Sequence, residues 1–121
     1  MGAVNPIVIR GAASAIAVVV LRGELDAYNG PAVKRELDAA LEAGIDLVVD
    51  LREASFIDSV VGGQLLEARK EAKRRGAGFA LVLSDSRANH VRRMLEQTNL
   101  IEIFDVFDTP ENAAVALRAS A

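Results

Sequence analysis

The chain has 121 residues, of which 51% are hydrophobic and only 4% aromatic, which is enough for a single domain with an aliphatic core. Its net charge of -3 argues against nucleic acid or an anionic membrane as a partner. Having no cysteine and one histidine, it offers no disulfide, thiolate zinc site or cysteine nucleophile. No apolar run approaches the roughly 18 residues of a membrane span. We expect one cytoplasmic domain over residues 1–121, without metal or cofactor.

Strands and helices are predicted to alternate along the chain. Runs rich in Val, Ile, Leu or Phe predict strands at residues 7–10, 15–23, 45–51, 78–84 and 103–107. Apolar residues at helical spacing predict helices at residues 31–43, 60–75 and 86–97. Gly44 and Gly76 can end the first two helices. A last helix should follow Thr109 as its cap, with Pro110 in the first position.

The element order is therefore β-β-α-β-α-β-α-β-α, an α/β fold with one mixed, mostly parallel sheet packed with helices. The first two strands are too close for a crossover helix and should pair antiparallel at one edge, whereas the later strands should be parallel. Functional sites in such sheets gather where the strands end. Two segments there carry polar residues: G-E-L-D-A-Y-N-G at residues 23–30 and F-I-D-S-V-V-G-G at residues 56–63.

The start of the helix after residue 58 follows conflicting local rules. Ser59 is a good helix N-cap, which gives it a purely structural interpretation. The next four residues, V-V-G-G, open a helix poorly, because valine is stiff and glycine costs about 1 kcal/mol relative to alanine. One interpretation is an exposed valine patch with glycine allowing a partner backbone to approach. The other is that the glycines let the helix pack tightly on the sheet.

The acidic residues beside these segments also allow two interpretations. Asp58 can be stabilised by the dipole of the following helix, or it can orient the Ser59 hydroxyl or bind a partner's cation. The residues Asp26, Tyr28, Asn29 and Gly30 are ordinary turn formers ahead of Pro31. As the only tyrosine, Tyr28 would suit a contact that is half apolar and half polar.

Residues 50–66, D-L-R-E-A-S-F-I-D-S-V-V-G-G-Q-L-L, and the G-E-L-D at residues 23–26 resemble the signatures of STAS domains, the family of bacterial anti-sigma factor antagonists. The resemblance implies that the unphosphorylated protein binds an anti-sigma factor and frees a sigma factor for transcription. It also implies that the anti-sigma factor, a serine kinase, ends this binding by phosphorylating Ser59, and that a phosphatase restores it. The resemblance and the residue types together give the expected partner-binding residues as Glu24, Asp26, Tyr28, Asp58, Val60, Val61 and Gly62.

Val60 and Val61 stand where the family pattern has a second serine and then glycine. This departure leaves open a diverged member that binds its partner without being phosphorylated. A second hypothesis is a constitutive STAS assembly module, in a stress-signalling scaffold or a lipid-transport complex, with Ser59 acting only as a helix cap. The sequence does not decide which anti-sigma and sigma factors are involved, whether a small ligand binds, or whether the protein is a monomer or a homodimer.

Enzyme hypotheses find little support in the residues. Asp50 ends a strand as the phosphoacceptor of a receiver domain would, but the acidic pair and the lysine of that site are missing. No glycine-rich nucleotide loop follows a strand. His90 lies beside Arg92 and Arg93 on the side of a helix expected to face solvent. We therefore predict no catalytic residue and a protein that acts by binding.

Overall fold

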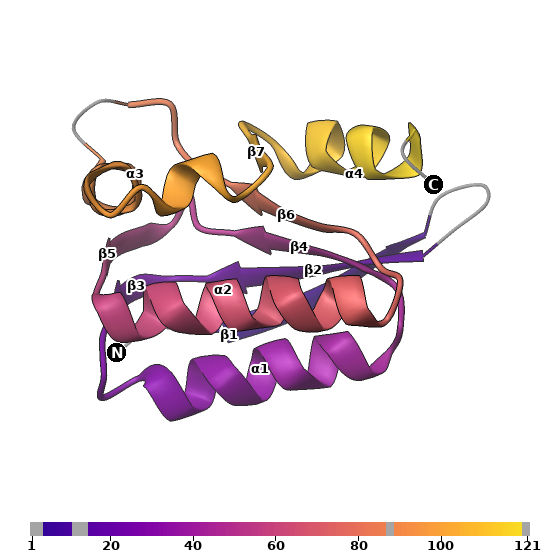
Figure 1. The fold of residues 1–121 in the computed structure, drawn as a ribbon, viewed down its shortest axis with the longest axis horizontal. Coiled ribbons are helices and arrows are strands. Elements are labelled where there is room, and N and C mark those ends of the chain that lie inside the picture. The colour runs from indigo at the N-terminus through magenta and orange to yellow at the C-terminus, as the bar shows by residue number, and fades with distance from the viewer. Residues whose placement is uncertain (1–3, 11–14, 87–88, 120–121) are drawn as a thin grey trace.

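A mixed sheet forms the centre of the fold, with helices on both of its faces (Figure 1). The computed structural model of the protein describes residues 4–10, 15–86 and 89–119. Within these residues the main sheet has five strands, in the order β1 (Val4–Arg10), β2 (Ala15–Leu21), β4 (Asp46–Asp50), β6 (Phe79–Val82) and β7 (Val106–Phe107). β1 pairs antiparallel with β2, and the other neighbours are parallel. The predicted fold class, edge pair and parallel centre are confirmed.

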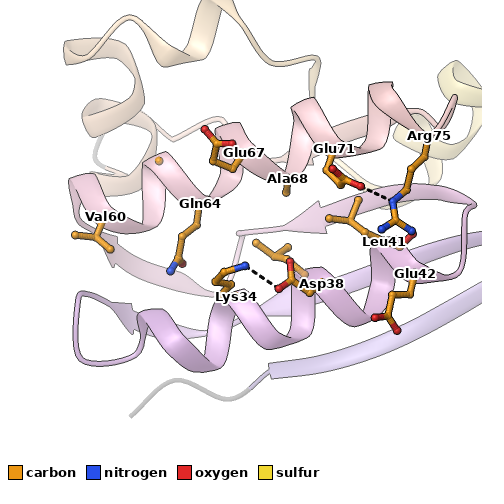
Figure 2. A pocket seen from close by; sticks show the side chains of 12 residues that line it. Lys34, Asp38, Leu41, Glu42, Val60, Gln64, Glu67, Ala68, Glu71 and Arg75 are labelled. Carbon is orange, nitrogen blue, oxygen red and sulfur yellow. Dashed lines mark hydrogen bonds and ion pairs between the residues drawn. The ribbon is translucent and has the colours of Figure 1, made fainter.

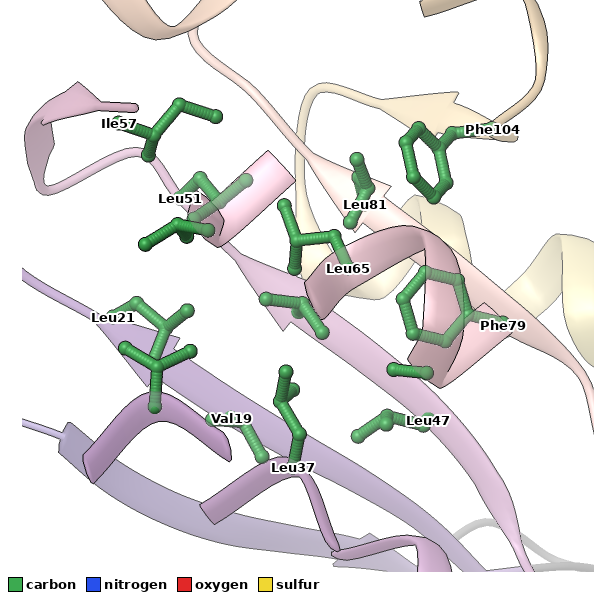
Figure 3. Close-up of a cluster of buried hydrophobic side chains, with 14 of the residues drawn as sticks. Val19, Leu21, Leu37, Leu47, Leu51, Ile57, Leu65, Phe79, Leu81 and Phe104 are labelled. Atoms are coloured by element: carbon green, nitrogen blue, oxygen red, sulfur yellow. The ribbon is translucent and has the colours of Figure 1, made fainter. Parts of the chain in front are cut away.

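The two faces of the sheet bury two separate apolar clusters. Successive residues of a strand point to opposite faces, so Leu47 and Val49 of β4 lie in the larger cluster and Val48 between them in the smaller one. Helices α1 (Gly30–Glu42), α2 (Ser59–Arg74) and α3 (His90–Gln97) contribute to the larger cluster. Figure 3 shows Leu37 of α1 and Leu65 of α2 within it. Helix α4 (Pro110–Ala119) contributes to the smaller one. None of the helices in the described ranges is long and apolar enough to cross a membrane.

A second, two-stranded sheet lies beside the first helix turn of α2 (Figure 1). Its parallel strands are β3 (Gly23–Leu25) and β5 (Ala54–Ile57), neither of which was predicted as a separate strand. Gly23 has φ +78°, which separates β3 from the end of β2. The side chains of Leu25 and Ile57 are fully buried in the larger cluster, and this burial holds the short pair against the domain.

Several predicted element ends are confirmed. Gly44 and Gly76 follow α1 and α2 with φ +68° and +74°, the left-handed conformation that ends a helix. The Thr109 hydroxyl accepts a hydrogen bond from the Asn112 amide at 3.0 Å, so Thr109 caps α4. These residues fix the lengths of the helices that flank the sheet.

Some predicted elements differ in length from those observed. The helix predicted over residues 86–97 is described from His90 to Gln97, and Asn89 caps it by accepting the Arg92 amide at 2.9 Å. Residues 87 and 88 of the prediction lie outside the described residues. The strand predicted at residues 103–107 is reduced to Val106–Phe107, and a 3-10 turn at Leu100–Glu102 precedes it.

Candidate functional site

The small sheet brings the two polar segments together. Leu25 is paired with Ile57, and the Asp58 amide donates to the Leu25 carbonyl at 3.1 Å. Asp26 and Asp58 therefore directly follow two neighbouring parallel strands, at the same end of the pair. The segment of residues 23–30 therefore lies beside the start of α2.

Asp58, and not Ser59, caps helix α2. Asp58 has extended backbone angles, and its Oδ1 accepts a hydrogen bond from the Val61 amide at 3.0 Å. Ser59 is instead the first helical residue and is exposed. Its hydroxyl makes no hydrogen bond to any residue in the described ranges. The predicted cap role of Ser59 is wrong, since the carboxylate one residue earlier takes the free amide that the hydroxyl would have accepted from.

The two valines after Ser59 have different environments. The side chain of Val60 is 47% exposed, whereas Val61 is fully buried in the larger apolar cluster. Adjacent helix residues point about 100° apart, so both cannot share one surface. Val60 remains a candidate contact residue. The prediction that Val61 is exposed for a partner is wrong, because its side chain belongs to the core.

The two glycines of α2 also differ. A Cβ on Gly62 would lie 3.1 Å from the Met94 Cε and 3.3 Å from the Leu100 Cδ1, so Gly62 allows α2 to pack against α3 and the following turn. Gly62 is buried, which makes the prediction that it contacts a partner wrong. Gly63 is exposed, and a Cβ there would meet nothing within 4 Å. Gly63 is thus the open position that the sequence interpretation had assigned to Gly62.

The turn before α1 is held by its own side chains. Asp26 Oδ1 accepts hydrogen bonds from the Tyr28 amide at 3.0 Å and the Asn29 amide at 3.2 Å. The Asn29 side-chain amide donates to the Glu24 carbonyl at 2.5 Å. The predicted turn role is confirmed. Its consequence is that Tyr28 projects outward, 86% exposed.

The start of α1 is tied to the first turns of α2. The Gln64 Nε2 donates to the Gly30 carbonyl at 3.0 Å. A Cβ on Gly30 would lie only 3.3 Å from that nitrogen and 3.7 Å from the Val60 Cγ1, so glycine permits this close approach. The turn that carries Tyr28 and the helix turn that carries Ser59 are therefore parts of one connected surface.

We call this surface the Ser59 surface; it consists of Glu24, Asp26, Tyr28, Phe56, Asp58, Ser59 and Val60. Phe56, which sequence reasoning missed, is 45% exposed and is paired with Glu24 across the small sheet. The one signal in the sequence was a large aromatic residue within the polar segment of residues 56–63. Carboxylates next to exposed apolar side chains suit a protein partner that presents basic and apolar groups. Within the described ranges, no three His, Cys, Asp or Glu residues are grouped to hold a metal ion.

Asp50 and His90 lie outside the Ser59 surface. Asp50 is the last residue of β4, is buried, and accepts hydrogen bonds from the Arg52 backbone amide and guanidinium. The hydrogen bond to Asp50 raises the pKa of Arg52 above its ordinary value. Asp50 is thus engaged at a strand end, as the sequence suggested. His90 is exposed at the start of α3, also as expected.

Comparison with known proteins gives a consistent result. The model of the STAS domain family matches residues 7–113. The anti-sigma-B factor antagonist of Listeria monocytogenes is 34% identical over 84 residues, covering 68% of this chain and 70% of the relative. That of Bacillus subtilis is 28% identical over 82 residues, covering 68% and 72%.

Solved structures share the fold. An anti-sigma factor antagonist from Mycobacterium paratuberculosis superposes with a TM-score of 0.77 at 24% identity, over 96% of this chain and 95% of the other. The phosphorylated form of the Bacillus cell fate determinant SpoIIAA gives a TM-score of 0.60 at 20% identity, over 94% and 98%. The family match spans most of the chain, including both segments of the Ser59 surface. The chain belongs to the STAS domain family.

Proposed function

We propose that this protein is an anti-sigma factor antagonist that binds an anti-sigma factor through the Ser59 surface and is released when that serine kinase phosphorylates Ser59. The relatives of the chain that carry the name anti-sigma-B factor antagonist support the role. The observation that carries the switch is the Ser59 hydroxyl, which is exposed in the first turn of α2 and has no hydrogen-bond partner in the described part of the chain. A kinase can reach such a hydroxyl without unfolding the helix.

A phosphate on Ser59 is compatible with the start of helix α2 but not with binding of the anti-sigma factor. A phosphoserine adds about -1.5 to -2 charges, and the amides of Ser59 and Val60 at the start of the helix lack intrahelical acceptors, so they favour an anion. The same group adds bulk where a partner would pack against the Ser59 hydroxyl, and its charge would lose its hydration in the interface. Phosphorylation therefore changes the electrostatic character of the interface and leaves the fold intact. A phosphatase that removes the phosphate would restore binding.

The test begins by identifying the partner. The tagged protein is captured from its source cell, and mass spectrometry identifies the bound anti-sigma factor and any phosphate on Ser59. Calorimetry then measures binding of this anti-sigma factor to wild type, Ser59→Asp and Ser59→Ala. We expect Ser59→Asp to lose at least about 2.7 kcal/mol, a hundredfold in affinity, from desolvation of the new charge and loss of close contact at Ser59. Ser59→Ala should bind like wild type and resist phosphorylation.

Val115→Asp is a matched control for added charge. Val115 is 59% exposed on α4, the helix that packs on the opposite face of the sheet, so this variant should keep wild-type affinity. Equal binding by wild type and Ser59→Asp, with no phosphate on Ser59 in cells, would contradict the proposal. The constitutive assembly module would then be the better account.

A further inference from the structure

A groove of about 760 Å³ runs between α1 and α2, starting at the Ser59 surface (Figure 2). Its floor is apolar, formed by the buried side chains of Leu37, Leu41 and Ala68. Val60 lies at one end and Arg75 at the other. Val60 belongs both to the Ser59 surface and to the groove, so the two surfaces are continuous. A partner bound at Ser59 can therefore also contact the groove.

Gly63 lines the groove and is not explained by packing within the chain. Glycine in a helix is unfavourable relative to alanine and needs a reason. For Gly62 the reason is internal, because a Cβ would crowd Met94 and Leu100. For Gly63 a Cβ would meet nothing within 4 Å. The missing side chain therefore leaves space for an atom from outside the chain.

The rim of the groove carries excess negative charge. The charged side chains that line the groove are four acidic ones, Asp38, Glu42, Glu67 and Glu71, and two basic ones, Lys34 and Arg75. Lys34 and Asp38 neutralise each other at 2.8 Å. Glu71 is paired with Arg74 and with Arg75, the C-cap of α2. In the described ranges, Glu42 then has no ion pair, and Glu67 has only a 3.7 Å contact with Lys70. Together with the carboxylates of the Ser59 surface, these residues favour a basic occupant, and they would repel the same groove of a second copy.

The length and lining of the groove fit a helix. From Val60 to Arg75 the axis of α2 rises about 22 Å at 1.5 Å per residue, which corresponds to roughly four helical turns. An amphipathic helix lays its apolar stripe into such a groove and keeps its basic residues on the rim. We propose that the groove binds a basic amphipathic helix of the same protein partner that contacts Ser59, with the helices in closest approach at Gly63. This inference rests on the proposed function and extends its contact surface along α2.

A defined peptide tests the groove independently of the partner. The probe is a 15-residue helical peptide with leucine on one face and lysine on the other, titrated into the ¹⁵N-labelled protein and followed by NMR. We expect amide shifts at Val60, Gly63 and Glu67, and at least a tenfold loss of affinity in Gly63→Gln, which fills the groove. A peptide with glutamate replacing lysine should not bind. The control Ala39→Gln adds the same side chain at an exposed α1 position that does not line the groove, and should bind like wild type.

The anti-sigma factor identified by capture provides the second arm. Gly63→Gln should weaken its binding at least tenfold without lowering the melting temperature, because the side chain enters open space and glutamine favours a helix more than glycine does. If Ser59→Asp abolishes this binding but Gly63→Gln does not change it, the groove inference is overturned and the proposed function stands. If no anti-sigma factor is captured, the proposed function fails, and the peptide titration alone decides whether the groove binds a basic helix. Equal shifts with both peptides, shifts outside the groove, or self-association through the groove would overturn the inference.

Discussion

The two ends of helix α2 follow different rules. The first turns, residues 59–64, contain two glycines and an exposed valine, and the carboxylate that complements the helix dipole comes from the N-cap Asp58. The last turns, residues 67–75, carry paired charges: Glu71 binds Arg74 and Arg75, and the Arg75 guanidinium donates to the Leu41 carbonyl at 3.2 Å. The C-terminal end thus has paired charges and is joined to α1 by a hydrogen bond.

Under the proposed function, the difference marks the end of the helix at which a partner would bind. A helix with a well-paired end and a buried apolar stripe can tolerate poor helix formers at its other end. Those poor formers lie next to Ser59 and along the groove, where an outside surface can approach. Residues at the two ends, and neighbours within the first turn, should therefore respond differently to substitution.

The largest expected difference separates the two valines. Val61→Ala removes two methyl groups from the core and should lower the free energy of unfolding by about 2 kcal/mol. Val60→Ala removes a half-exposed side chain and should change it by less than about 0.5 kcal/mol. Urea denaturation of both variants measures the effect. Equal losses would mean that Val60 is also part of the core.

The next difference concerns the helix cap. Asp58→Ala removes the carboxylate that accepts the Val61 amide and should cost about 1 kcal/mol. Ser59→Ala should change stability by less than about 0.5 kcal/mol, since the hydroxyl accepts no amide. Thermal melts at neutral pH compare the two variants. A larger loss for Ser59→Ala than for Asp58→Ala would return the cap to Ser59.

The main architecture could be predicted from sequence because its patterns are long. The core strands are aliphatic runs, and the helices carry apolar residues at helical spacing, which together give the order and the parallel centre. β3 and β5 could not be predicted as strands. They are three and four residues long, and only Leu25, Ala54 and Ile57 show their buried side. Their pairing depends on contacts distant in the sequence.

The sequence predicted which segments form the site. The errors concern neighbouring residues within those segments, where one residue was assigned the role of the next. Helical spacing already placed Val61 on the core face, so its burial could have been predicted. Whether Asp58 or Ser59 caps could not, because both residue types are good caps in adjacent positions. The choice between Gly62 and Gly63 depends on where Met94 packs, which is tertiary information.

Substituting the two glycines of α2 by alanine should change stability less, and differently at the two positions. Gly63→Ala should raise the free energy of unfolding by up to about 1 kcal/mol, from helix propensity in open space. Gly62→Ala should gain less or lose stability, because the new methyl would crowd the ends of Met94 and Leu100. Denaturation curves of both variants provide the comparison. An equal gain at both positions would show that the side chains of Met94 and Leu100 move aside at no cost in stability.

The smallest effect on stability is expected at the charged end of α2. Hydrogen bonds from Arg74 and then Arg75 lower the pKa of Glu71 from 4.5 to about 2. Because the pKa is lowered in the folded state, the contribution of the Glu71 ion pairs to the free energy of unfolding is fully present above pH 4.5. It is lost as the pH falls toward 2. NMR titration of the Glu71 carboxyl should show the low pKa, and 1 M salt should move it toward its ordinary value, because the group is solvent-accessible. Arg74→Gln should raise the pKa, and Lys70→Gln should leave it nearly unchanged. A Glu71 pKa near 4.5 in wild type would show that the pairs are not maintained in solution, and that the end of the helix depends on its apolar contacts with α1.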